Sequence, residues 1–310
     1  MTQPELHTPV MLSEVLEGLA LSPDAFVVDC TFGRGGHSRA ILDKLGCEGR
    51  LLALDKDPTA IESEEAMRLR ADSRFMVRHG SFADLAMWVA GEGRTGQVSA
   101  VLMDLGVSSP QLDEATRGFS FMREGPLDMR MDTSAGITAS QWISEVSETE
   151  LIRVLREFGE ERYARRIAAA VVRHRKAQPL TTTRSLVRII EQAVPNRDIH
   201  KHPATRTFQA IRLAINGDLD VLKRAQSSIP GILGSGGRWV VIAFHSLEDR
   251  LVKRIMRDQE LGQRVDPRLP IQTESTGLLK RIGKARLPSE EEIRLNPIAR
   301  SAVLRIDERR

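Results

Sequence analysis

The stretch Val27-Val28-Asp29-Cys30-Thr31-Phe32-Gly33-Arg34-Gly35-Gly36-His37 decides the fold of this chain. Its apolar residues up to Asp29 predict a buried strand, and its three glycines turn the chain into a helix that begins near His37. A second predicted strand, Arg50 to Asp55, ends on a carboxylate twenty positions after Gly35. This spacing is typical of a Rossmann-like unit, in which such an acid accepts hydrogen bonds from ribose hydroxyls. The sequence therefore predicts a cofactor that contains adenosine.

The glycine loop distinguishes between two such cofactors. A dinucleotide loop has the pattern Gly-x-Gly-x-x-Gly, which seats a pyrophosphate on the helix N-terminus. Here Ser38 stands in place of the third glycine, and Asp29 at the strand end would repel a pyrophosphate. The Asp29 carboxylate could instead accept hydrogen bonds from an ammonium group, which favours S-adenosylmethionine over NAD. A purely structural glycine turn is the alternative.

Length and composition limit the classes of protein. The chain has 310 residues, enough for one large domain or two smaller ones. It has no apolar run of about 18 residues and no signal-peptide pattern at its start, so we expect a cytoplasmic protein without membrane association. Cys30 and Cys47 suit neither a disulfide framework nor a zinc site. His200 and His202 have no Cys near them and are a weak ligand set, so we expect no metal.

Positive charge is concentrated in one block. The net charge is only +3, but residues 151–215 contain 14 Lys and Arg against 5 Asp and Glu, which leaves −6 for the rest. Such a block indicates an anionic partner. One predicted helix in it carries six cations, several at spacings that share a face: Arg162, Arg165, Arg166, Arg173, Arg175 and Lys176. A solvated face is the usual explanation for such a run, whereas the excess of one sign favours phosphate contacts.

Polar or aromatic residues also follow two further predicted strands. Phe82 comes after the strand at 74–78 and is a candidate contact for an adenine base, or alternatively a core residue. Asp104 ends the strand that starts at Ser99, and Ser108-Ser109 beyond it could line a substrate pocket or form a plain turn. Ligands of open α/β sheets bind outside the carboxyl ends of the strands. We therefore expect these residues to converge with the two acids of the first strands.

The alternation of strands and helices stops for about a hundred residues. We predict a core at 1–110, an inserted α-helical domain at 111–205 and the rest of the core at 206–310. The insertion begins with an irregular stretch, 117–132, that alternates charged and large apolar residues and that we expect to fold over the site.

The alternation returns with a predicted strand at 239–243 and ends with one at 302–306, which we place antiparallel at the sheet edge. His245-Ser246 after the first of these strands suggests a hydrolase. However, no Gly-x-Ser-x-Gly elbow is present, and adjacent strand residues point to opposite faces. A pocket-lining role for His245 is the better interpretation. Residues 259–298 are expected to form a loop or weak helix.

Seven blocks between about His7 and Arg305 make this sequence resemble the bacterial small-subunit rRNA methyltransferase H family. They are Asp29-x-Thr-x-Gly-x-Gly-Gly-His37-Ser38, Asp104-Leu-Gly-Val-Ser-Ser-Pro-Gln-Leu-Asp113, Arg117-Gly-Phe-Ser-Phe, Gly125-Pro-Leu-Asp-Met-Arg-Met131, Lys201-His-Pro-Ala-Thr-Arg-Thr-Phe-Gln209, Phe244-His-Ser-Leu-Glu-Asp-Arg250 and Asn296-Pro-x-Ala-Arg-Ser301. The one departure noted is Asp218-Leu219, where the family more often has Glu-Leu.

The resemblance implies a class I S-adenosylmethionine-dependent methyltransferase (Rossmann-like) core with an inserted α-helical domain. It implies methyl transfer from S-adenosylmethionine to N4 of one cytidine in the decoding region of 16S rRNA. The partner is then 16S rRNA or the small ribosomal subunit, and a homodimer is one option that the sequence leaves open. The cofactor contacts that the motifs imply are Gly35, Gly36, His37, Asp55, Phe82, Asp104 and Gln111.

The implied reaction restricts the catalytic residues. A cytosine amino group is a poor nucleophile because its lone pair is delocalised into the ring, so the enzyme must orient it and accept hydrogen bonds from its protons. The best-placed candidate acceptors are Asp104 and the backbone carbonyls that follow it, and Asp128, His245 and Glu248 are further candidates behind them. Two other classes stay open: an NAD-dependent oxidoreductase, and a non-catalytic RNA-binding protein on the same scaffold.

Overall fold

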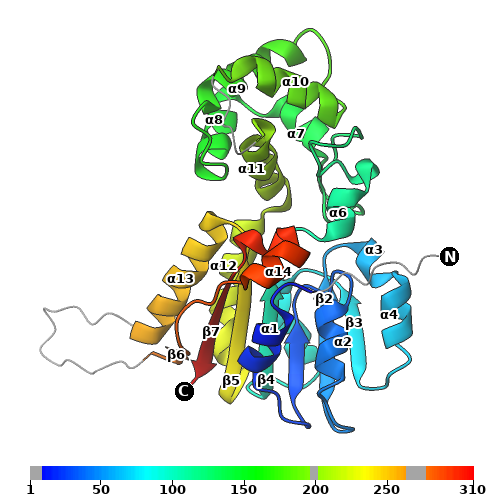
Figure 1. Cartoon of the computed structure of the whole chain (residues 1–310), viewed down its shortest axis with the longest axis vertical. Coiled ribbons are helices and arrows are strands. Elements are labelled where there is room, and N and C mark those ends of the chain that lie inside the picture. Colours follow the sequence, from blue (N-terminus) through cyan, green and yellow to red (C-terminus); the bar gives the residue numbers. More distant parts are fainter. Residues whose placement is uncertain (1–8, 196–201, 263–276) are drawn as a thin grey trace, which may run out of the picture. The chain divides into compact units, whose positions relative to one another are not determined.

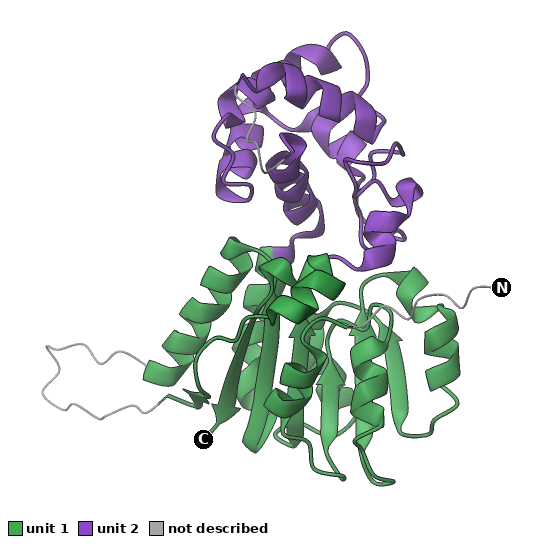
Figure 2. Cartoon of the chain, in the orientation of Figure 1, with its two compact units in different colours: residues 1–106, 219–310 green, residues 107–218 purple. Residues whose placement is uncertain are grey.

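The chain divides into two compact units, which Figure 2 colours separately. Our computed structural model describes residues 9–195, 202–262 and 277–310. Unit 1 comprises residues 1–106 and 219–310, and unit 2 comprises residues 107–218. Unit 2 extends beyond the predicted insertion because helix α11 (Ala204–Asn216) buries Phe208 and Ile211 in the helical core of that unit.

Unit 1 is built on a seven-stranded sheet in the order β3-β2-β1-β4-β5-β7-β6 (Figure 1). Strands β1 to β5 pair in parallel, whereas β7 is antiparallel to β5 and β6. The strands are β1 (Phe26–Asp29), β2 (Arg50–Asp55), β3 (Phe75–His79), β4 (Val98–Asp104), β5 (Leu233–Ala243), β6 (Leu279–Arg281) and β7 (Val303–Arg309). This is the Rossmann-like α/β sheet that the sequence predicts.

Helices cover both faces of the sheet, as Figure 1 shows. Neighbouring strand residues serve different faces: Val27 belongs to one apolar core and Val28 to the other. The first core includes residues of α1 (Leu12–Leu19), α2 (Gly36–Leu42), α3 (Pro58–Ile61) and α4 (Glu64–Leu69). The second includes residues of α5 (Leu85–Gly91), α12 (Asp218–Ile232) and α13 (Ser246–Leu261). The sheet is therefore buried on both sides, and its strand ends are left for ligands.

Some boundaries in unit 1 differ from the sequence-based expectation. Residues 58–69 form two short helices, α3 and α4, because Ser63 accepts a hydrogen bond from the Ala66 N–H at 3.2 Å and caps the start of α4. The prediction of an antiparallel last strand is confirmed, but its edge position is wrong: the short β6 lies outside β7. Within the stretch expected to be loop or weak helix lie β6, α14 (Glu290–Leu295) and the first two residues of the 3₁₀ helix Pro297–Ser301.

Unit 2 is helical, and no strand occurs among its described residues. Before α11 come α6 (Ser109–Asp113), the 3₁₀ helix Ala115–Arg117, α7 (Ala139–Glu145), α8 (Glu148–Glu157), α9 (Ala164–Arg175) and α10 (Thr183–Ala193). The irregular stretch expected to fold over the site contributes Leu127 and Met129 to the core of unit 2. Its apolar residues therefore anchor it within this unit, and its covering role stays a prediction.

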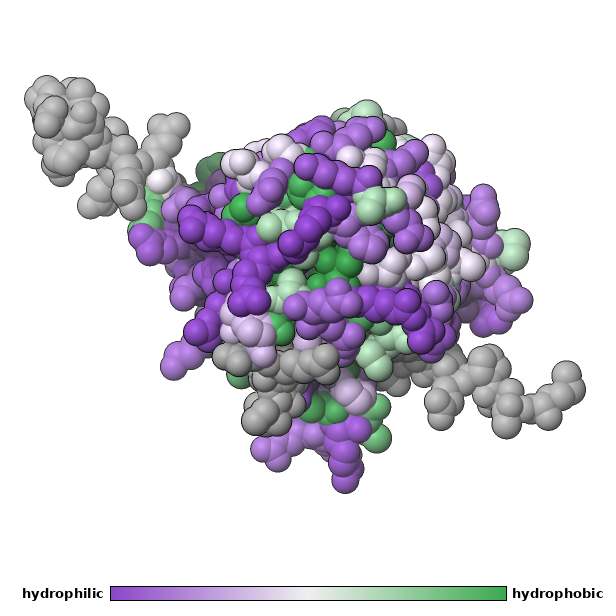
Figure 3. Space-filling view, turned by 90° about the horizontal axis from the view of Figure 1, so that it is seen from above, coloured by the Kyte–Doolittle hydropathy of each residue, from purple (hydrophilic) through white to green (hydrophobic). Residues whose placement is uncertain are grey.

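No helix among residues 9–195, 202–262 and 277–310 is long and apolar enough to cross a membrane. Hydrophilic residues dominate the face shown in Figure 3, and the hydrophobic ones appear there in small separate areas. Both cysteines are free; Cys30 is buried and Cys47 is exposed.

Candidate active site

The carboxyl ends of four neighbouring parallel strands meet at one edge of the sheet in unit 1. Strands β2, β1, β4 and β5 are adjacent in that order, and the first three end in Asp55, Asp29 and Asp104. His245 follows β5 after one intervening residue. The parallel pairing therefore brings these predicted residues to one edge, the usual ligand position of such a sheet.

Asp29, at the end of β1, already has partners within the protein. It is 0% exposed, and its Oδ2 accepts a hydrogen bond from Ser38 Oγ at 2.7 Å. Its Oδ1 accepts another from the Thr31 N–H at 3.1 Å. Burial raises the pKa of Asp29, and the hydrogen bond from Ser38 opposes that rise. Asp29 thus ties the glycine loop and α2 to the sheet; its predicted contact with an ammonium group stays a prediction.

Asp104, at the end of β4, differs from Asp29 in its surroundings. Its backbone N–H donates to Thr31 Oγ1 at 2.8 Å, which joins the ends of β4 and β1. Its Oδ2 lies 3.5 Å from Nε2 of His37, which is 6% exposed. Asp104 Oδ1 and His37 Nδ1 are buried without a hydrogen-bond partner among the described residues. Since buried polar atoms normally have partners, this pair suits a polar ligand.

Asp55, at the end of β2, is held in a fixed orientation. Its Oδ2 accepts from the Gly33 N–H at 2.7 Å and its Oδ1 from the Asp57 N–H at 2.8 Å. Burial raises the pKa of Asp55 to about 6, although both backbone hydrogen bonds oppose the rise. Each oxygen has a further lone pair, so the carboxylate retains acceptor capacity for ribose hydroxyls.

The glycines of the loop are required by close packing inside the protein. Gly35 has a φ of +73°, and a side-chain carbon there would lie 2.8 Å from the Phe32 ring. A side-chain carbon at Gly36 would lie 2.5 Å from Pro9. Any larger residue would displace the loop. The predicted cofactor contacts of Gly35 and Gly36 stay predictions.

Phe82 and His245 each have a local structural role. Phe82 begins a 3₁₀ helix (Phe82–Asp84) and packs, partly buried, against the second core, so its adenine contact stays a prediction. His245 is the N-cap of α13, and Oε2 of the buried Glu248 accepts from the His245 N–H at 3.2 Å. This capping box fixes the chain where it leaves β5. The proposed role of His245 in the pocket is compatible with that position.

Gln111 and Asp128 belong to unit 2 and are described with it. Gln111 is buried, and its Oε1 accepts from the Ser108 N–H at 3.1 Å in the capping box that starts α6. Arg130 donates to Asp128 Oδ1 at 2.8 Å and to Oδ2 at 2.9 Å. Burial raises the pKa of Asp128, but the hydrogen bonds and charge of Arg130 outweigh this and lower it overall. Their predicted site contacts stay predictions.

The basic helix of the sequence is α9, preceded by Arg162. Five of the six cations are exposed, and none of these five forms an ion pair with a described residue. Arg175 is different, because its guanidinium donates to the backbone carbonyls of Ile143 and Val146. Arg175 therefore holds the end of α7. Its inclusion among the candidate phosphate contacts was wrong.

Three residues that organise the site were not singled out from the sequence for this role: Thr31, Ser38 and Asp57. Thr31 joins the ends of β1 and β4, and Ser38 partners Asp29. Asp57 caps α3 by accepting from the Thr59 N–H at 3.0 Å. Thr31 and Ser38 lie within the first motif block, so their spacing from Asp29 was the available signal.

Comparisons of the sequence with known proteins identify the family of this chain. The model of the MraW methylase family matches residues 5–310. A "Ribosomal RNA small subunit methyltransferase H" of Methylococcus capsulatus is 57% identical over 97% of this chain and 99% of its own length. The protein of the same name from Alteromonas mediterranea is 50% identical over the full length of both chains.

A third relative of that name, from Hydrogenovibrio crunogenus, is 51% identical over 98% of this chain and 96% of its own. Similarity to solved structures is weak: an rRNA methylase from Streptococcus thermophilus covers 100% of this chain and 98% of its own, with 12% identity and a TM-score of 0.41. The family match and the three relatives decide the assignment, and the chain belongs to the MraW methylase family.

Proposed function

We propose that this protein transfers a methyl group from S-adenosylmethionine to N4 of one cytidine in the decoding region of 16S rRNA. Its family and the names of its relatives support methylation of small-subunit rRNA. The observation that carries the proposal is the pair Asp104 and His37, whose buried polar atoms lack partners among the described residues. Family membership argues against the NAD-dependent oxidoreductase.

The residues at the sheet edge fit S-adenosylmethionine. When bound, this cofactor supplies a methyl group on a positively charged sulfur. Asp55 has acceptor capacity for the two ribose hydroxyls, in the orientation that its two backbone partners impose. The loop with Gly35 and Gly36 would lie along the cofactor, and Phe82 beside its base. The negative charges of the strand-end acids suit a cationic ligand better than a pyrophosphate.

Asp104 is the best acceptor for the target amino group. Its Oδ1 is buried and without a partner among the described residues, so a hydrogen bond from the amino group would satisfy it. Such a bond orients the nitrogen and receives the proton that the amino group must lose. His37, 3.5 Å from Oδ2, restricts the orientation of the carboxylate. His245 and Asp128 are further candidate acceptors.

The exposed cations of Arg162, Arg165, Arg166, Arg173 and Lys176 would bind the rRNA backbone. Several of them are separated by three or four residues along α9 and its two ends, and none has an ion-pair partner among the described residues. Contacts of this kind supply affinity that does not depend on sequence. The target base must be unstacked to reach a pocket, and the stretch 119–131 would form a wall for it.

A methylation assay tests this proposal. Purified protein and labelled S-adenosylmethionine are incubated with naked 16S rRNA and with small subunits from cells that lack the modification. We expect label as N4-methylcytidine at one site, and we propose that the reaction takes place in the cytoplasm. The comparison of the two RNA samples decides whether naked 16S rRNA or the assembled subunit is the substrate form. Cofactor binding with no labelled RNA would instead favour another substrate, whereas RNA binding without cofactor binding would favour the non-catalytic alternative.

The same preparation answers the question of assembly. A homodimer was left open by the sequence, and light scattering of the purified protein at assay concentration gives its mass directly. Activity that follows the dimer fraction on dilution would make the homodimer the working form. Constant activity through dissociation would make one chain sufficient.

A further inference from the structure

A basic groove lies between α12 and α13 in unit 1, apart from the cations of α9. Its volume is about 970 Å³. Five cations and one acid line it: Lys223, Arg250, Lys253, Arg254, Arg257 and Asp258. Leucines complete its lining, among them Leu219 and Leu251. The groove thus combines an apolar surface with an excess of positive charge.

The acids of α13 do not neutralise its cations. The helix contains four acids and four basic residues, so its formal charge is zero. However, Asp249 receives two hydrogen bonds from Arg305, at 2.7 and 3.0 Å, and Glu260 pairs with Arg281 at 3.1 Å. Glu248 is buried as the capping residue of the helix. Lys223 of α12 pairs with Asp220 at 2.9 Å, and Asp258 is the acid of α13 that lines the groove. Lys253, Arg254 and Arg257 therefore give the groove an excess of positive charge.

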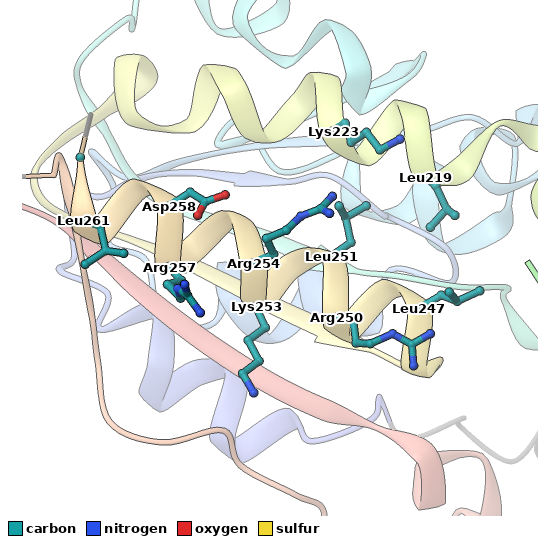
Figure 4. Close-up of a pocket in the computed structure, with 11 residues that line it drawn as sticks. Leu219, Lys223, Leu247, Arg250, Leu251, Lys253, Arg254, Arg257, Asp258 and Leu261 are labelled. Atoms are coloured by element: carbon teal, nitrogen blue, oxygen red, sulfur yellow. The ribbon is translucent and has the colours of Figure 1, made fainter. Parts of the chain in front are cut away.

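The cations are arranged along one helix. Pairs among Arg250, Lys253, Arg254 and Arg257 are separated by three or four residues, which places these side chains on one side of α13. All four are exposed, and neither Arg254 nor Arg257 forms an ion pair with a described residue. In Figure 4, Arg254 and Leu251 point from α13 toward α12, and Leu219 points from α12 toward α13.

The groove begins at the edge of the sheet that holds the candidate site. Helix α13 starts at Ser246, after the two residues that follow the carboxyl end of β5. From Arg250 to Arg257 a helix rises about 10 Å, so the cations lead away from that edge over the length of a few nucleotides. Site and groove lie in the same compact unit.

We infer that this groove binds the ribose–phosphate backbone of a single-stranded RNA segment next to the target nucleotide. The inference rests on the proposed function and adds a second phosphate-binding surface to it. Arginine guanidinium groups bind phosphate oxygens through two parallel hydrogen bonds, which gives fixed geometry as well as charge. The leucines would contact sugars or unstacked bases, as apolar surfaces do in single-strand binding grooves.

A matched pair of double variants tests the groove. Arg254→Gln/Arg257→Gln removes two of its charges, and Lys44→Gln/Arg70→Gln removes two exposed charges elsewhere in unit 1. The dissociation constant for a single-stranded fragment of the decoding region is measured over a series of salt concentrations. The groove variant should bind about tenfold more weakly, with a salt slope lower by about 1 to 2. Its cofactor affinity and kcat should be unchanged, and its KM for RNA should rise.

Three results would overturn the inference, and each leaves the proposed function separately readable. The first is equal binding of the fragment by the two double variants, because any loss of affinity would then reflect total charge alone. The second is normal binding of naked RNA but weak binding of assembled subunits by the groove variant, which would identify a ribosomal protein as the occupant of the groove. The third is the absence of any binding of the fragment by the wild-type protein. Methylation of subunits by the wild type is measured in parallel and decides the proposed function on its own.

Discussion

The ends of β1 and β4 lie side by side in the sheet, yet their two acids have different surroundings. Asp29 has hydrogen-bond donors from Ser38 and Thr31 at its two oxygens. Asp104 has one oxygen near His37 and the other buried without a partner among the described residues. A carboxylate that is satisfied within the protein stabilises the fold, whereas one left incomplete is available for a ligand. We therefore propose that the same residue type at adjacent strand ends holds the loop at Asp29 and takes part in the chemistry at Asp104.

The largest effect is expected from Asp104→Ala. Loss of the acceptor for the target amino group should lower kcat about a thousandfold, since acceptors and general bases of this kind contribute 10² to 10⁴. Single-turnover methyl transfer to small subunits measures the change. The thermal unfolding midpoint should stay within a few degrees of the wild-type value, which excludes misfolding as the cause. Turnover close to that of the wild type would remove Asp104 from the chemistry.

A smaller effect, on cofactor affinity, is expected from Asp55→Asn. Loss of hydrogen bonds to a charged acceptor should weaken S-adenosylmethionine binding about tenfold to a hundredfold. Calorimetric titration measures the dissociation constant, and circular dichroism of the variant serves as its folding control. Equal affinity in variant and wild type would mean that the ribose hydroxyls do not contact this acid.

The pH dependence of binding sharpens the same prediction. The pKa of Asp55 is raised to about 6 by burial, so the acid is ionised above that pH and protonated below it. The hydroxyls bind the ionised form, and the affinity should therefore fall as pH drops through 6, by up to tenfold per unit. The Asn variant should lack this fall. A wild-type affinity that rises toward pH 5 would contradict the assignment.

The smallest effect on turnover is expected at the end of β1. Ser38→Ala removes the donor to a buried carboxylate and should lower the free energy of unfolding by about 1 to 3 kcal/mol. The turnover of the folded protein should change less than threefold, because Asp29 acts through the position of the loop. Urea unfolding and single-turnover assays on the same sample separate the two quantities. A loss of turnover as large as that of Asp104→Ala would make the two strand ends equivalent.

The sequence was sufficient to predict the elements that follow simple patterns. Buried runs that end on Asp29, Asp55 and Asp104 predicted three strands within one or two residues of their observed bounds. Strand β6 has only three residues, one of them buried, and so presents no period that could reveal it. The limits of unit 2 depend on whether α11 packs into the core of unit 1 or of unit 2. The amphipathic pattern of α11 is compatible with both.

The position of the site could be predicted from the sequence, but the hydrogen-bond partners of each residue in it could not. Strand ends placed the acids at one edge, yet nothing in their spacing told Asp29 from Asp104. That difference comes from Ser38 and Thr31, whose hydroxyls take up particular partners only in the folded chain. Likewise, Arg175 is like the other cations of its helix in sequence, and only the packed carbonyls of α7 set it apart.

The most direct test of the difference between the two strand ends is a crystal structure of the protein with S-adenosylhomocysteine and cytidine. We predict that the cytidine amino group lies within hydrogen-bond distance of Asp104 and that the ribose of the cofactor product lies against Asp55. Asp29 should keep its hydrogen bonds to Ser38 and Thr31 in this complex. A structure in which Asp29 leaves Ser38 to bind the ligand, while Asp104 contacts neither molecule, would contradict the account.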